Sequence, residues 1–124
     1  MGLKKLNREI NSDLLSLSHA KAISMIPNTE WVKAGNLQCF KIADRFIFQF
    51  SEVSFTKTGS LGNTGNLLWT MDGDGPGIGY ERVFLLYPIL KDENPIRIIV
   101  ASNKVYGHYT DVKANVDYYG MLIM

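Results

Sequence analysis

From Trp31 to its C-terminus, the chain consists of short apolar or alternating runs separated by clusters of Gly, Asn, Asp and Pro. The clearest run is RFIFQFSEVSF (residues 45–55), in which Phe46, Phe48 and Phe50 alternate with other side chains. Side chains two residues apart point to the same face of a β-strand, so this run predicts a half-buried strand. The repeated clusters of turn-forming residues predict consecutive antiparallel strands over residues 31–124.

A helical period is present only near the N-terminus. Apolar residues recur there at spacings of three and four, at Leu3, Leu6, Ile10, Leu14 and Leu17. A second register follows, with Leu15, Ala22, Ile23 and Ile26. Pro27 disfavours a helical conformation in the residue before it. The pattern predicts an amphipathic helix, or two short helices, over residues 1–27.

An amphipathic helix needs a surface on which to bury its apolar side. We therefore expect an α+β fold, with the N-terminal helix packed on a curved antiparallel β-sheet of five to seven strands. Residues 1–124 are predicted to form a single domain. Gly35-Asn36, between WVKA and LQCFKIA, is predicted to be a two-residue hairpin turn.

Charge and cysteine content exclude few functions. The formal net charge is +1, so any polyanion would have to bind a local patch. Cys39 is the single cysteine, which rules out an internal disulfide and argues against a structural zinc site. The longest apolar run, VFLLYPIL, is far shorter than the ~20 residues of a membrane-spanning helix. With no signal-peptide pattern at its start, the sequence predicts a cytoplasmic protein without membrane contact.

The glycine-rich stretch MDGDGPGIGY, residues 71–80, does not fit a ligand-binding loop. A phosphate-binding glycine loop opens a helix, whereas a strand pattern follows here, and Asp72 would repel a phosphate. A calcium loop needs acidic residues at its fifth and twelfth positions, which are Pro76 and Val83. The stretch is interpreted as a connection, and neither a metal nor a cofactor is predicted.

Glu81, Arg97 and His108 are the candidate catalytic residues. Each lies near the end of a predicted strand, and the three strands follow one another in the sequence. If neighbouring strands pair, a carboxylate base, a guanidinium and a histidine acid could meet at one phosphate. Such a set cleaves RNA without a metal. Three unrelated strand-end side chains are the alternative interpretation.

The same stretches, YERVFLLYP, IRIIVAS and YGHYTD, resemble the C-terminal half of the barnase-like microbial ribonucleases over about thirty residues. The resemblance implies a sheet behind N-terminal helices. It also implies Glu81 as the base, Arg97 as the phosphate-binding residue and His108 as the acid, with RNA as the substrate.

The preferred hypothesis is a small partner- or ligand-binding protein, of an inhibitor, immunity or phage type, that self-associates into a homo-oligomer. Tyrosines concentrate late in the chain, and tyrosine suits interfaces because it combines a large apolar surface with a polar tip. Tyr106, Tyr109 and Arg82 are the candidate binding residues. The chain ends on the apolar run YYGMLIM, which is either interior to the sheet or paired with another chain. The ribonuclease is the alternative function.

Overall fold

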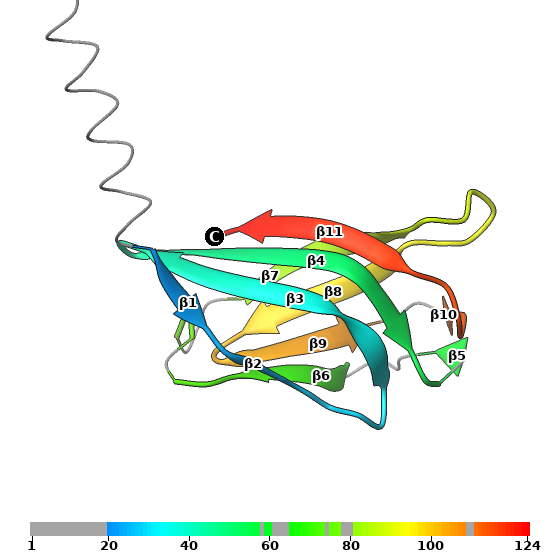
Figure 1. Cartoon of the computed structure of the whole chain (residues 1–124), viewed down its shortest axis with the longest axis horizontal. Coiled ribbons are helices and arrows are strands. Elements are labelled where there is room, and N and C mark those ends of the chain that lie inside the picture. Colours follow the sequence, from blue (N-terminus) through cyan, green and yellow to red (C-terminus); the bar gives the residue numbers. More distant parts are fainter. Residues whose placement is uncertain (1–19, 58, 61–64, 74, 78–80, 109–110) are drawn as a thin grey trace, which may run out of the picture.

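The computed structural model describes residues 20–57, 59–60, 65–73, 75–77, 81–108 and 111–124. These residues form β-strands and contain no helix (Figure 1). The strands are β1 (Lys21–Ile23), β2 (Met25–Pro27), β3 (Val32–Ile42), β4 (Arg45–Phe55), β5 (Gly59–Ser60), β6 (Asn66–Met71), β7 (Glu81–Pro88), β8 (Ile96–Ala101), β9 (Lys104–His108), β10 (Asp111–Val112) and β11 (Tyr118–Ile123).

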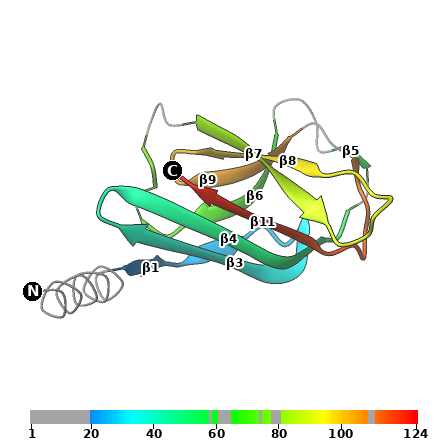
Figure 2. The ribbon, with the colours of Figure 1, turned by 90° about the horizontal axis from the view of Figure 1, so that it is seen from above.

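Nine strands form one antiparallel sheet in the order β1-β3-β4-β11-β7-β8-β9-β6-β2, and β5 pairs with β10 separately. The two ends of this order are consecutive segments of the chain. Ile23 of β1 pairs with Cys39 of β3, and two residues later Met25 of β2 pairs with Met71 of β6. The segment 21–27 therefore joins both edges of the sheet, which curls into a nearly closed barrel (Figures 1 and 2).

The barrel interior is filled by alternate side chains of nearly every long strand. In β4, Phe46, Phe48 and Phe50 are buried, as the alternation in the sequence predicts. The ring centroid of Phe50 lies 5.6 Å from that of Trp69 and 5.3 Å from that of Phe84. These contacts connect β4, β6 and β7 across the interior, and burial of such rings is the main force holding the strands together.

The expected α+β class is wrong for the described residues, which are all-β. Residues 21–27 form strands because both sides of this segment find a β partner, an outcome that local periodicity does not register. The predicted helix over residues 1–19 lies outside the described residues. The sheet also has nine strands instead of five to seven, since β1 and β2, in the segment expected to be helical, add to the strands read from the sequence.

Gly35 and Asn36 do not form the predicted hairpin turn, because β3 runs through them. The pairing with β4 shifts register on both sides of Ala34, and Gly35 has a φ of 129°. A Cβ at Gly35 would lie 2.4 Å from Val53 Cα, so only glycine allows this approach of the two strands. The hairpin turn lies instead between Ile42 and Arg45, where Ala43 has a φ of 55°.

Candidate functional site

The strand register brings together two of the three candidate catalytic residues. Arg97 of β8 lies directly opposite His108 of β9. On the other side of β8, Arg97 faces Leu85, whereas Glu81 faces Ala101. Ala101, the residue opposite Glu81, lies four residues from Arg97 along β8. At the rise of a β-strand, this separation is about 13 Å.

This arrangement supplies part of the chemistry that RNA cleavage requires. Arg97 is exposed and His108 is half-buried, so a guanidinium and an imidazole stand on neighbouring strands. A base must reach the 2′-hydroxyl within hydrogen-bonding distance, and the register does not place Glu81 beside the other two residues. The ribonuclease stays an alternative hypothesis, which an RNA cleavage assay tests.

The candidate binding residues do not share a face of the sheet where they are described. Tyr106 lies opposite Ile99, and Arg82 lies opposite the buried Val100. Because Ile99 and Val100 are consecutive residues of β8, they alternate between the two faces. Tyr109, the third candidate, lies outside the described residues.

The glycine-rich stretch before β7 packs against the turn between β8 and β9. A Cβ at Gly75 would lie 2.0 Å from the carbonyl oxygen of Ser102 and 2.5 Å from Asn103 Cα. Gly73 and Gly77 adopt positive φ values of 101° and 103°. In the part that the structure describes, the glycines therefore permit a close backbone approach and tight bends.

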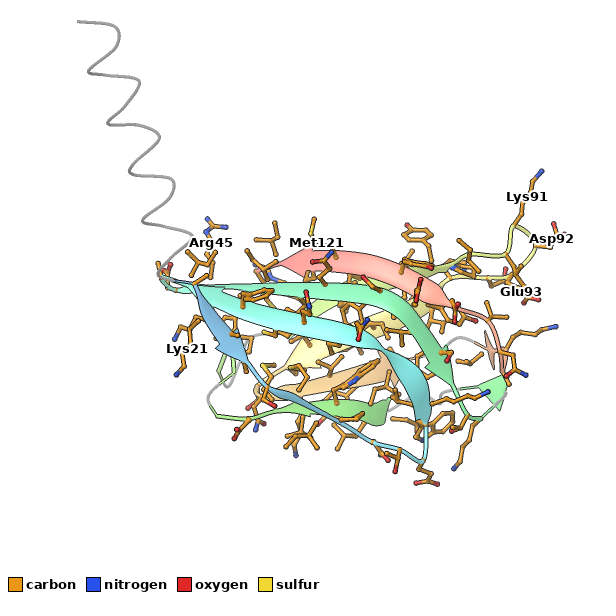
Figure 3. The ribbon with its side chains drawn as sticks, viewed as in Figure 1. Lys21, Arg45, Lys91, Asp92, Glu93 and Met121 are labelled. Carbon is orange, nitrogen blue, oxygen red and sulfur yellow. The ribbon has the colours of Figure 1, made fainter. Side chains whose placement is uncertain are left out.

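A set of exposed apolar side chains occupies the outer surface of β7 and β11. We call it the β7–β11 face, and its members are Val83, Leu85, Tyr87, Tyr119, Met121 and Ile123. Tyr119 is half-buried, and the other five side chains are 39–63% exposed. Met121 projects from β11 away from the barrel interior (Figure 3). These residues are the most exposed apolar group that neighbouring strands of the described sheet share.

Register explains why these six side chains point outward together. Tyr119 lies directly opposite Tyr87, and their neighbours Tyr118 and Leu86 are completely buried. Two residues further along β11, Met121 lies opposite Gln49 of β4. The β7–β11 face is therefore continuous between the two strands at Tyr87 and Tyr119. From this pair it extends along β7 through Leu85 and Val83, and along β11 through Met121 and Ile123.

Sequence reasoning named none of these six residues as a site, although a signal was present. A strand with one solvated face alternates apolar and polar residues. The run VFLLYP is apolar on both faces of the strand. Phe84 and Leu86 face inward, whereas Val83, Leu85 and Tyr87 face outward. An antiparallel strand that is apolar on both faces indicates a surface with a second partner.

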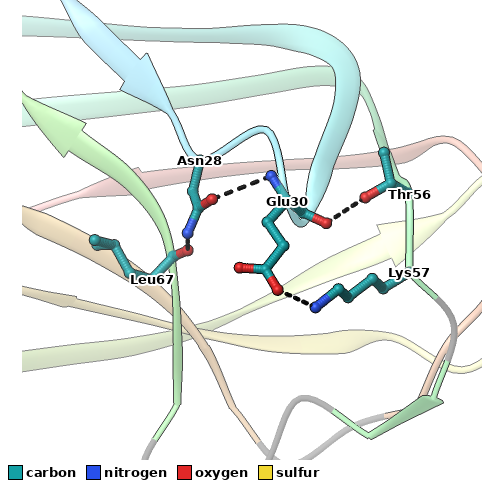
Figure 4. A network of polar contacts seen from close by, with 5 residues as sticks. All are labelled: Asn28, Glu30, Thr56, Lys57 and Leu67. Carbon is teal, nitrogen blue, oxygen red and sulfur yellow. Dashed lines mark hydrogen bonds and ion pairs between the residues drawn. The ribbon is translucent and has the colours of Figure 1, made fainter.

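One cavity of about 340 Å³ opens between β2 and β3, over Leu37 and Trp69. Thr29 of the loop between β2 and β3 lines this cavity, and polar contacts hold the loop in place (Figure 4). Asn28 Nδ2 donates to the Leu67 carbonyl at 3.0 Å, and Thr56 Oγ1 donates to the Glu30 carbonyl at 2.6 Å. Glu30 also forms an ion pair with Lys57. The loop is well anchored, but the cavity collects no set of groups that defines a ligand.

Two further cavities lie at one end of the barrel and share Lys41. One, of about 230 Å³, also contacts Asp44, Phe46 and Met124, and the other, of about 360 Å³, contacts Lys21 and Asp72. Lys21 and Lys41 lie directly opposite each other on β1 and β3. Acidic and basic groups are mixed at this end, so it favours neither an anion nor a cation.

Cys39 is buried, and its burial raises the pKa of the thiol to about 12. A protonated thiol is a poor nucleophile, so Cys39 acts as a small apolar core residue.

Within the described ranges, no group of three or more His, Cys, Asp or Glu side chains could hold a metal ion. None of the described segments is a helix of the length and hydrophobicity needed to cross a membrane.

Comparison with known proteins gives no relative: no protein-family model, curated protein or solved structure matches this chain.

Proposed function

We propose that the protein is a small binding protein whose partner is another protein chain and whose contact surface is the β7–β11 face. The observation that supports this function is the exposure of five large apolar side chains on two neighbouring strands. Exposing apolar surface to water is unfavourable, and monomeric proteins rarely expose a continuous apolar patch above a few hundred Å².

The size of the face supports a contact surface. A fully exposed aromatic side chain has an area of about 150–250 Å². The six side chains of the β7–β11 face, each about half exposed, therefore present on the order of 500 Å² of apolar surface. None of the six side chains carries a charge at neutral pH. An apolar centre with polar neighbours, here Gln49 of β4 and Arg97 of β8, is the usual composition of a protein interface.

A binding function also agrees better with the geometry than the alternative ribonuclease. The β7–β11 face is formed by residues that pairing places side by side, whereas the register separates Glu81 from Arg97. Tyr87 is the exposed tyrosine of this face. It replaces Tyr106 and Arg82 as the proposed binding residue. Tyrosine at the centre of a contact surface supplies a large area at a low cost in conformational entropy.

Site-specific photocrosslinking in the cells that naturally carry the chain tests the function. The photoreactive residue p-benzoylphenylalanine replaces Tyr87 or Met121 in two variants and Ile26 in a matched control. Ile26 is exposed to nearly the same extent but lies on β2, several strands away in the sheet. We expect crosslinked species from position 87 and none from position 26. If positions 87 and 121 both give only the uncrosslinked chain, the face is not a contact surface.

A further inference from the structure

We infer that the β7–β11 face binds the same face of a second copy of the chain. This inference rests on the proposed function and names the partner of that surface. Two sheets that pack face to face bury their facing side chains in a layer about 10 Å thick. In the assembly, Tyr87, Leu85 and Met121 would form the centre of such a layer between two barrels.

The area of the face matches what an association between copies requires. A specific interface buries roughly 800 Å² on each partner, and homodimer interfaces are about 65% apolar. The apolar side chains of the face supply on the order of 500 Å² of that surface. Gln49 and Arg97, which lie next to Met121 and Leu85, would supply the polar margin.

The charge distribution favours a second copy over a strongly charged partner. The charged groups that the structure describes next to the face lie at its margin. Arg97 lies opposite Leu85, and the Glu52 and Asp117 carboxylates act on Tyr119, whose pKa is raised by burial first and by these two groups second. A surface with an uncharged centre does not repel a copy of itself. It offers a highly charged partner no counter-charge at that centre.

Light scattering coupled to size-exclusion chromatography of the full-length chain tests the inference. We expect a mass of two copies at about 100 µM, with dissociation on dilution. Tyr87→Lys and Met121→Lys place charges in the apolar centre and should each weaken association at least about tenfold. Ile26→Lys, which adds the same charge to β2, should leave the mass unchanged.

A fold control and a milder variant keep this test decisive. Thermal unfolding should show that all three lysine variants remain folded, and Tyr87→Ser provides a variant without added charge. A monomeric wild-type chain at the highest soluble concentration contradicts the inference. Equal association of the wild type, Tyr87→Lys and Met121→Lys also contradicts it, because another surface must then mediate contact.

The photocrosslinking experiment separates failure of this inference from failure of the proposed function. Crosslinks from position 87 to a different protein, combined with a monomeric purified chain, leave the binding function in place and disprove the second copy. Absence of any crosslink from positions 87 and 121 contradicts both.

Discussion

Tyr87 of β7 and Tyr119 of β11 lie directly opposite each other on the outside of the barrel. In the described residues, pairing between these strands covers only Tyr118 and Tyr119 with Pro88 and Tyr87. The exposed face is therefore centred on the short segment where β11 connects to β7. A partner that covers this face would also cover that connection.

Association through the β7–β11 face should respond to salt as an apolar contact does. Screening weakens contacts between exposed charges, whereas sulfate strengthens the burial of apolar surface. We expect the dissociation constant of the wild-type assembly to stay constant or fall when sodium sulfate is added. Sedimentation velocity over a dilution series measures this. An affinity that decreases steeply with salt would indicate a contact mediated by charges such as Arg97.

Neighbouring tyrosines of β11 should differ sharply in their contribution to stability. Tyr118 is completely buried, with its ring 5.7 Å from that of Phe55, whereas Tyr119 lies on the outer face. Tyr118→Ala should lower the free energy of unfolding by about 3–5 kcal/mol, and Tyr119→Ala by less than about 1 kcal/mol in the monomeric state. Urea denaturation measures both.

Tyr118→Phe is the matched control for that comparison. The Lys113 N–H donates to the Tyr118 hydroxyl at a long distance of 3.5 Å. Loss of the hydroxyl should therefore cost less than about 1 kcal/mol. A large loss in Tyr118→Phe would show that this hydrogen bond, and not ring burial, stabilises β11.

The glycines before β7 should tolerate a methyl group unequally. At Gly75 the added Cβ would meet backbone atoms of Ser102 and Asn103, which have little room to move. At Gly73 the Cβ would meet nothing within 4 Å, and only its positive φ causes strain. Gly75→Ala should cost about 3 kcal/mol or more, and Gly73→Ala about 1–2 kcal/mol, in thermal or urea unfolding. The reverse order would show that this segment does not pack on the β8–β9 turn.

Stability should fall in alkaline solution because of Cys39. Burial raises the pKa of its thiol from 9.0 to about 12, so the unfolded chain loses this proton at lower pH than the folded chain. Its contribution to stability is complete below about pH 9 and is lost between about pH 9 and pH 12. The pKa of Tyr118 is also raised, chiefly by burial, which acts in the same direction above pH 10.

Replacing the thiol isolates its part of this pH dependence. Cys39→Val keeps an apolar side chain at the position and removes the titrating group. Urea denaturation at a series of pH values between 8 and 10 should give a flatter stability profile for this variant than for the wild type. Identical profiles would assign the alkaline loss to other groups.

The purified protein should not cleave RNA in the presence of EDTA. Glu81 lies opposite Ala101, four residues from the position where Arg97 meets His108, so the register does not place this carboxylate beside the other two residues. Incubation with a mixed-sequence RNA tests this, with His108→Ala as the control. Cleavage by the wild type that disappears in His108→Ala would restore the ribonuclease hypothesis.

Local sequence patterns predicted the strands whose two faces differ in environment. RFIFQFSEVSF coincides with β4, because its inner phenylalanines pack in the core while Gln49 faces solvent. The pattern loses its period after Ser51, where Glu52 has a φ of 52° and the next three residues are all buried. A bulge of this kind depends on the partner strand, here through Gly35 of β3, and is invisible in either strand alone.

Long-range pairing accounts for the features that were missed. Ile23 pairs with Cys39 of β3 and Ile26 with Thr70 of β6, so the three-residue spacing that resembled a helical register belongs to two strands with different partners. Likewise, the β7–β11 face required knowing that Tyr87 and Tyr119 are neighbours across about thirty residues of sequence. The apolar content of both strands was visible in the sequence, but the side that stays uncovered was not.

The position of β11 has a consequence for how the barrel is made. This last strand of the chain lies between β4 and β7, in the middle of the sheet. During synthesis, every other strand leaves the ribosome before the one that connects these two halves. The sheet can be completed only after the C-terminal residues emerge, and such non-local pairing slows folding. Until then, the inner faces of β4 and β7 lack this neighbouring strand, and exposed apolar surface of this kind is prone to aggregation.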